Sequence, residues 1–439
     1  MLRTALALLL AICHAVLLSA CGDSGNSSSG ALVKNDLVLQ KTGGNYQEVR
    51  HIVLKGTNQE IGKSLAQLSK DYYQAQPMQF PAQDGLSYKA SRNSYIQQYF
   101  PTLAARQRGI EAYYGWGAND LNDSSALWYD MQPVKCSAIF FPKSVTANGH
   151  SFQARNMEFY TVDMYRFAVP PYTVDGHGNK LFSRNFVLET YPQDGGYATM
   201  VVGTFDLVNG AFDGFNEHGL SISGLVDQSL KLTAGITTMT QQPGLSYLQM
   251  VRMILENART VDDVPKLLAN LTVYFPLDGI HFLLGDRNGN ARFLEFYSPD
   301  GKTLSFRYFA QDQTKILVKP TIMTNHPMWE NFDTSSSKYQ YDPTKSYDTY
   351  YRYMRLYDYL QASAFHYYTP DDGLYAMSLV YGYANDSSEG AAEPFPVRTI
   401  WSLVMDVDDL SLKIKFYTVD NEAQKTPVFT DTMTFKMQK

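Results

Sequence analysis

Three residues with catalytic potential stand where one hairpin could bring them together. Cys136 opens the apolar run Cys136–Phe141, residues 147–150 form a polar turn, and the returning strand carries Arg155 and Glu158. The two strands of a hairpin lie side by side, so the three side chains are expected to be neighbours. A guanidinium beside a thiol favours the thiolate, the nucleophilic form of cysteine. The segment therefore predicts a cysteine nucleophile with a cation and an acid beside it.

The N-terminal residues predict export and a lipid anchor. Arg3 precedes an apolar run at 5–18 that is too short for a transmembrane helix. The run ends in Leu-Ser-Ala-Cys at 18–21, which resembles the lipobox of bacterial lipoproteins, and a flexible Gly/Ser-rich tether follows at 22–30. The resemblance implies that Cys21 carries lipid and anchors the protein to a membrane. An ordinary secretion signal cut nearby is the alternative.

This leader also decides how the three cysteines are interpreted. Cys13 would be removed and Cys21 lipidated, which leaves Cys136 without an intramolecular partner. Cysteines of exported proteins are usually paired, so an unpaired one is either catalytic or simply buried. Gly22 is not the aspartate associated with inner-membrane retention, which favours the periplasmic or cell-surface side of an outer membrane.

Composition excludes several classes of function. The chain has 439 residues, a net charge of −6 and no basic block, which argues against nucleic-acid binding. Hydrophobic residues make up 44% and aromatic residues 14%, as in a globular protein. The eight histidines are scattered, and no phosphate loop or dinucleotide motif is present, so no metal and no cofactor are expected.

Two regions of the chain differ in pattern. Residues 36–135 are predicted to be mostly helical, with apolar faces at 58–73 and 93–114. Beyond them, strand-like runs alternate with helices, which predicts an α+β domain of two packed sheets covered by helices. The predicted strands are 137–141, 151–154, 185–190, 197–202, 219–225, 281–285, 292–297, 304–309, 399–405 and 412–417, and the predicted helices are 245–257, 260–271, 346–360 and 370–381. The predicted divisions are a signal peptide at 1–20, a lipidated tether at 21–35, the helical region at 36–135 and the main domain at 136–439.

Five short motifs follow Cys136 in a fixed order. They are Arg-Asn-Met-Glu at 155–158, Phe-Asp-Gly-Phe-Asn-Glu-His-Gly-Leu at 212–220, Thr-Asn-His-Pro at 324–327, Tyr-Arg-Tyr at 351–353 and Arg-Thr-Ile-Trp-Ser at 398–402. In this order they resemble the linear amide C–N hydrolases of the N-terminal-nucleophile superfamily, which includes choloylglycine hydrolases, penicillin V acylases and acyl-CoA:6-aminopenicillanate acyltransferases. The resemblance implies a four-layer αββα sandwich, preceded by a propeptide or α-chain.

The resemblance also implies a reaction. Cleavage of the chain between Lys135 and Cys136 would free an α-amino group with a pKa of about 8, which can exchange a proton near neutral pH. The thiol would then attack an amide carbonyl, and water would release the acid from the acyl-enzyme. The expected activity is hydrolysis of a non-peptide linear amide of small-molecule size.

The roles of the family's site residues carry over by position. Arg155 would lie beside the sulfur, Glu158 would orient the amine, and Arg352 would support site geometry and processing. The side-chain amide of Asn325 and the backbone N–H of Val226 would bind the oxyanion. Two positions depart from the family pattern: Glu158 replaces an aspartate, and Val226 stands where many relatives have asparagine.

Several alternatives stay open at this point. One is an acyltransferase of the same fold, and another is a ligand-binding lipoprotein that has lost catalysis, for which Val226 and Glu158 would argue. A surface protein that uses its 32 tyrosines for carbohydrate or partner contacts is a third. A Cys–His protease that uses His218 or His326 would leave the order of the motifs unexplained. No pattern indicates the acyl group, the amine or the oligomeric state.

Overall fold

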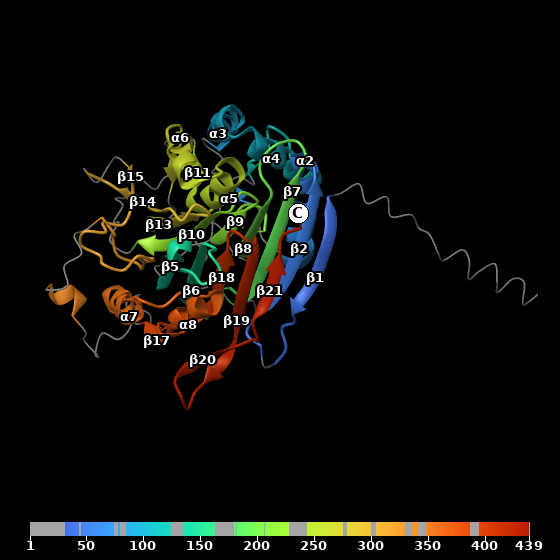
Figure 1. Ribbon diagram of the computed structural model, residues 1–439. Helices are drawn as coiled ribbons and strands as arrows, with labels where there is room; N and C mark the ends of the chain where they lie inside the picture. The colour runs from blue at the N-terminus through green and yellow to red at the C-terminus, as the bar shows by residue number, and fades with distance from the viewer. Residues whose placement is uncertain are drawn as a thin grey trace, which may run out of the picture.

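Two large β-sheets lie face to face with helices on both outer sides (Figure 1). The computed structural model describes residues 31–43, 45–73, 78–79, 85–123, 135–162, 180, 182–205, 207–227, 244–274, 279–299, 304–329, 336–340, 348–386 and 395–438. The expected signal peptide, Cys21 and most of the tether lie outside these residues. The predicted α+β class and the αββα layering are confirmed.

The first sheet has nine strands in the order β1-β2-β7-β8-β9-β10-β13-β14-β15. Neighbouring strands are antiparallel except for β2 and β7, which are parallel. The bounds are β1 Leu32–Leu39, β2 Glu48–Gly56, β7 Arg184–Pro192, β8 Thr199–Thr204, β9 Asp213–Asn216, β10 Leu220–Asp227, β13 Gly279–Asp286, β14 Ala291–Tyr297 and β15 Ser305–Phe309.

The second sheet has eight strands and contains the predicted catalytic hairpin. Its main path is β16-β5-β6-β18-β19-β20, with β17 on β18 and β21 on β19. All residues of β5 and β6 are buried, because this hairpin lies between the first sheet and the outer helices. The bounds are β5 Cys136–Phe141, β6 Phe152–Tyr160, β16 Thr321–Met323, β17 Tyr383–Asp386, β18 Phe395–Asp406, β19 Ser411–Asn421, β20 Thr426–Phe429 and β21 Met433–Lys436.

Helices cover the outer face of each sheet. α2 and α5 pack on the first sheet, with α3, α4 and α6 beside them, and α7 and α8 pack on the second (Figure 1). Among the described residues, no helix is both long and apolar enough to cross a membrane. The bounds are α2 Asn58–Leu68, α3 Gly85–Tyr99, α4 Pro101–Tyr114, α5 Tyr247–Asn257, α6 Val264–Leu268, α7 Thr349–Ala362 and α8 Pro370–Ser378. Shorter elements are a π-turn at Ser69–Tyr73, 3-10 turns at Lys143–Val145, Val261–Asp263 and Ser337–Tyr339, and the two-residue strands β3 Met78–Gln79, β4 Asn122–Asp123, β11 Leu245–Ser246 and β12 Val273–Tyr274.

The region before Cys136 is built into the first sheet. The predicted helices at 58–73 and 93–114 are found as α2 and as α3 with α4, but β1 and β2 were not predicted. β2 pairs with β7 from Glu48 opposite Arg184 to Gly56 opposite Pro192. β7 lies more than 100 residues further along the chain, so no local turn predicts this pairing, whereas β1, the other neighbour of β2, directly precedes it.

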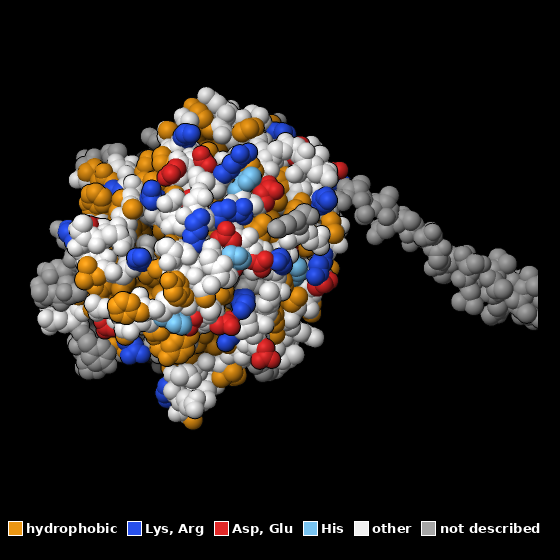
Figure 2. Space-filling view, viewed as in Figure 1, with side chains coloured by type: hydrophobic (Ala, Val, Ile, Leu, Met, Phe, Trp, Pro, Cys, Tyr) orange, Lys and Arg blue, Asp and Glu red, His pale blue; other side chains and the backbone are white. Residues whose placement is uncertain are grey.

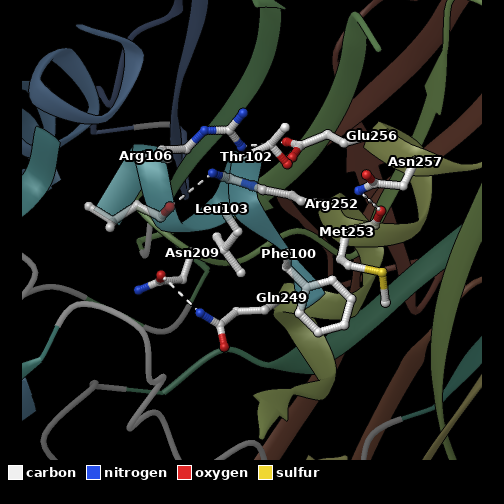
Figure 3. A pocket seen from close by; sticks show the side chains of 11 residues that line it. Phe100, Thr102, Leu103, Arg106, Asn209, Gln249, Arg252, Met253, Glu256 and Asn257 are labelled. Atoms are coloured by element: carbon white, nitrogen blue, oxygen red, sulfur yellow. Dashed lines mark hydrogen bonds and ion pairs between the residues drawn. The ribbon is translucent and has the colours of Figure 1, made fainter. Parts of the chain in front are cut away.

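A buried ion pair joins α4 to α5 across the same boundary. Arg106 Nη1 donates to Glu256 Oε1, and Nη2 donates to Asn58 Oδ1 at 2.7 Å. The side chains of Arg106 and Glu256 are only 2% and 3% exposed. Figure 3 shows this pair at a small pocket of about 10 Å³, lined by residues from both sides of the Lys135–Cys136 bond. The pair therefore ties the N-terminal helices to the main domain.

Candidate active site

Cys136 is the first residue of β5, and it is buried beside the predicted arginine. The residue is 2% exposed, and its Sγ accepts a hydrogen bond from Arg155 Nη2 at 3.4 Å. On the paired strand β6, Met157 lies opposite, with its Sδ 3.9 Å from the thiol sulfur. Burial raises the pKa of the Cys136 thiol, and the charge of Arg155 acts in the opposite direction. The hairpin thus brings thiol and guanidinium together.

Arg155 connects the thiol to two strands of the first sheet. Its Nη1 donates to Asp213 Oδ2 on β9 at 2.8 Å, and its Nη2 donates to the carbonyl of Gly224 on β10 at 2.9 Å. Trp401 Nε1 also donates to Asp213 Oδ2, at 3.0 Å. Burial raises the pKa of Asp213, and Arg155 opposes this shift. The guanidinium is therefore shared between a carboxylate and the nucleophile.

Asp213 was not singled out from the sequence, although it lies in the motif at 212–220. Strand spacing alone does not reveal which carboxylate will meet Arg155, because β6 and β9 belong to different sheets. The available signal was physical: a buried arginine needs a counter-charge, and Asp213 is the first residue of the buried strand β9.

Replacing Asp213 with asparagine is expected to lower the apparent pKa of Cys136. The carboxylate neutralises part of the Arg155 charge, so its removal leaves more of that charge for the thiolate, and the shift should be about one unit. The measurement is the rate of alkylation by iodoacetamide across a pH series. Asp194→Asn is the control, since Asp194 accepts hydrogen bonds from Asn58 instead. An unchanged or raised pKa in Asp213→Asn would contradict this charge balance.

Side chains bind both the backbone N–H and the backbone carbonyl of Cys136. Its N–H donates to Asn325 Oδ1 at 2.6 Å, and its carbonyl accepts a hydrogen bond from Arg352 Nη1. Arg352 also donates to Ser137 Oγ at 2.9 Å and to Asn325 Oδ1 at 2.8 Å. Asn325 lies just beyond β16, the strand next to β5, so its side chain continues the pairing where the backbone ladder ends.

The two residues expected to bind the oxyanion contact each other. Asn325 Nδ2 donates to the carbonyl oxygen of Val226 at 2.6 Å. Val226 lies near the end of β10, opposite Ile280. The amide group expected to bind an oxyanion therefore already has a backbone acceptor, and an oxyanion would compete with that carbonyl for it.

Glu158 lies on β6, three residues after Arg155, and is fully buried. Alternate residues of a strand point to opposite faces, so Glu158 points away from the side on which Arg155 meets the sulfur. Its Oε1 accepts a hydrogen bond from Thr399 Oγ1 at 3.2 Å. Burial raises the pKa of Glu158 to about 7, against the lowering effects of Arg352, the Thr399 hydrogen bond and Lys135. Glu158 therefore lies near Cys136, but its side chain points to the opposite face of β6 from the side chain of Arg155.

This pKa gives the stability of the uncleaved chain a defined pH dependence. Because the folded-state pKa of Glu158 lies above its ordinary value of 4.5, the folded chain binds more protons between about pH 4.5 and 7. The stability due to this group is present below that window and is lost as the pH rises through it. In a Cys136→Ala background, the free energy of unfolding is expected to fall between pH 5 and pH 7.5. In the Glu158→Gln variant this fall should be smaller by roughly 2–3 kcal/mol. Urea unfolding at pH 5 and pH 7.5 measures it, and equal pH dependence in both proteins would contradict the assignment.

Histidines take no part in the described contacts of Cys136. His326 is buried and bonded to Thr324 and Thr349, and burial lowers its pKa to about 3. His218 packs edge-on against Tyr197. Within the described residues, no group of three or more His, Cys, Asp or Glu side chains could hold a metal ion.

Comparison with known proteins finds one matching family model. The family model of acyl-coenzyme A:6-aminopenicillanic acid acyl-transferase matches residues 173–383, a range that contains Asp213, Asn325 and Arg352 but begins after Cys136. No curated protein matches the chain.

The solved structures similar to this chain include a bile acid hydrolase and a penicillin acylase. A mutant of the conjugated bile acid hydrolase from Clostridium perfringens is 14% identical, covers 69% of this chain and 97% of its own, and has a TM-score of 0.43. Penicillin V acylase from Agrobacterium tumefaciens is 17% identical, with coverages of 64% and 83% and a TM-score of 0.42. The family-model match agrees with the order of the motifs and with the αββα layering. Over residues 173–383, which are 211 of its 439 residues, the chain thus matches one family of the predicted N-terminal-nucleophile superfamily.

Proposed function

We propose that the protein hydrolyses a non-peptide linear amide with Cys136 as nucleophile, after cutting its own chain between Lys135 and Cys136. The observation that supports this most directly is the way the backbone of Cys136 is held. Its N–H and its carbonyl are bound by the buried side chains of Asn325 and Arg352. Such placement suits a site in which the nitrogen of Cys136 becomes a free amine with a catalytic task.

The proposed self-cleavage proceeds through a thioester. The Sγ of Cys136 attacks the carbonyl carbon of Lys135, the C–N bond breaks, and the nitrogen of Cys136 takes up the thiol proton. Water then hydrolyses the thioester, which leaves a carboxylate on Lys135 and a free thiol and amine on Cys136. The same thiol next attacks the substrate carbonyl. The substrate amine leaves with a proton that the α-amino group of Cys136 returns, and water releases the acid.

The test starts from the wild-type chain without its lipid anchor, residues 22–439. Intact mass and N-terminal sequencing are expected to show two fragments, the second beginning at Cys136. Hydrolysis of a library of small amides is expected to stop once one equivalent of iodoacetamide has reacted at Cys136. A purified chain that stays intact and hydrolyses none of the amides would reject the proposal in favour of a binding lipoprotein.

Acyl transfer is the second candidate, and the matched acyl-transferase family model favours it. The same acyl-enzyme would then pass its acyl group to an amine instead of water. Adding small amines to the hydrolysis assay separates the two reactions. A transferase forms mainly the new amide, whereas a hydrolase forms mainly the free acid.

We also propose that the mature protein is a lipoprotein anchored through Cys21. The support is the sequence alone, because the leader lies outside the described residues. Metabolic labelling with an alkyne fatty acid in a bacterial host is expected to label the wild type. Cys21→Ser is expected to abolish the label and release the protein from the membrane fraction. Equal labelling of both proteins would reject the anchor.

A further inference from the structure

The carboxylate of Glu295 binds the backbone of the segment that carries Asn325. Its Oε1 accepts the backbone N–H of Met328, and its Oε2 accepts that of Trp329 at 3.2 Å. The carboxylate lies on β14 of the first sheet and is buried, whereas the loop at 324–329 follows β16 of the second sheet. One side chain therefore links the two sheets three residues after Asn325.

The imidazole of His281 packs beside this carboxylate. It stands directly opposite Glu295 in the β13–β14 pair and opposite Leu225 in the β10–β13 pair, next to Val226. The imidazole is fully buried, and its Nδ1 lies 3.6 Å from Glu295 Oε1. Within the described residues, neither ring nitrogen makes a hydrogen bond. The ring thus lies against the Glu295 carboxylate and has no hydrogen-bond partner among the described residues.

The near end of the loop is held by different groups. Thr324 Oγ1 donates to the carbonyl of Thr349 on α7 at 3.1 Å, which ties the loop to the second sheet's helices. Asn325 Nδ2 reaches Val226 on the first sheet. Beyond Asn325, among the described residues, the backbone hydrogen bonds of segment 324–329 to the first sheet are the two that Glu295 accepts. The segment is therefore held on both sides of Asn325.

We propose that Glu295, supported by His281, is a positioning residue that aims Asn325 at the carbonyl oxygen under attack. This inference rests on the proposed function, because Asn325 is there the oxyanion donor. A preorganised donor stabilises a transition state only if it is already aimed at the developing charge. Loss of the Glu295 contacts leaves the hydrogen bonds of Asn325 to Cys136, Arg352 and Val226 but loosens the backbone that carries this side chain. The reaction then slows, although the nucleophile, Arg155 and Asp213 are untouched.

The first experiment tests the contacts themselves. Glu295→Gln keeps the shape of the side chain but replaces one acceptor oxygen with an NH₂ group. Glu189→Gln is a matched control, because Glu189 is a buried carboxylate 2.7 Å from His51 on the far strands β7 and β2. Hydrogen exchange of the peptide covering 324–329 is expected to become about tenfold faster in Glu295→Gln and to stay unchanged in Glu189→Gln. Unchanged exchange in Glu295→Gln would overturn the inference.

The second experiment tests whether Glu295 acts through Asn325. Rates of self-cleavage and amide hydrolysis are measured in Glu295→Gln, Asn325→Ala and the double variant. Asn325→Ala is expected to slow both by about 10²–10³, and Glu295→Gln by roughly tenfold or more. The double variant should be no slower than Asn325→Ala, whereas a purely structural role would multiply the two effects. Multiplied effects, or a Glu295→Gln rate equal to that of Glu189→Gln, would overturn the inference.

The two experiments separate this inference from the proposed function. A wild type that neither cleaves itself nor hydrolyses amides rejects the function, and with it the aiming role. An active wild type with an equally active Glu295→Gln variant rejects the aiming role alone. Retention of the same melting temperature in both glutamine variants excludes general unfolding as the cause of a slower rate.

Discussion

The Cys136→Ala protein is expected to remain a single chain and to hydrolyse no amide above background. Both steps of the proposed chemistry need the same sulfur, first against the carbonyl of Lys135 and then against the substrate. Loss of the nucleophile in a covalent mechanism typically costs on the order of 10⁶ in turnover. The hydrogen bonds from Asn325 and Arg352 bind the backbone of residue 136, so they survive the substitution and the fold should be retained.

Cys136→Ser provides the graded comparison. Serine can follow the same path with a poorer nucleophile, so slow self-cleavage over hours is the expected result. Mass spectrometry of the purified proteins over time measures it, and near-ultraviolet circular dichroism checks the packing. Cleavage at the same bond in Cys136→Ala would show that another group or a host protease cuts the chain.

Glu256→Gln is expected to destabilise the protein by about 3–5 kcal/mol, because it leaves the Arg106 guanidinium buried without its counter-charge. In a chain cut before Cys136, the two partners would belong to different fragments, and the one cysteine among the described residues, Cys136, is free. The destabilisation should therefore also appear as dissociation of the fragments at lower urea concentration. Urea titration followed by size-exclusion chromatography measures both effects.

Two further variants test whether the lost charge pair is the cause of the destabilisation. Asp262→Asn removes a carboxylate from an exposed pair with Arg292, which lies 3.3 Å away, and should cost less than about 1 kcal/mol. Combining Arg106→Met with Glu256→Leu removes both charges and should recover much of the stability lost in Glu256→Gln. Equal costs for Glu256→Gln and Asp262→Asn would show that the buried pair does not hold the two parts together.

Local patterns predicted the centre of the molecule well. The hairpin at β5 and β6 has an apolar run, a polar turn and a second run in sequence, and all three signals are local. The same holds for β13 and β14, which are joined by a turn with Gly289 at φ 90°. Helices α7 and α8 begin directly after Asp348 and Thr369, whose side chains cap them, close to the predicted starts.

Contacts between distant segments were beyond the reach of these patterns. β2 gains its second neighbour, β7, more than 100 residues later, and Asp213 meets Arg155 only when the two sheets stack. The Glu295 contacts depend on a loop whose path no motif specifies.

The order of the strands in the two sheets determines which contacts can form early during synthesis and which must form late. β2 is synthesised early but has no neighbour on one side until β7 exists, and loop closure over such a distance is slow. The surroundings of Cys136 are complete only when Arg352 and Trp401, far downstream, have taken their places. Under the proposed mechanism, the bond before Cys136 therefore stays uncut throughout synthesis and export. The rate at which the two fragments appear would therefore report when the last step of folding is complete.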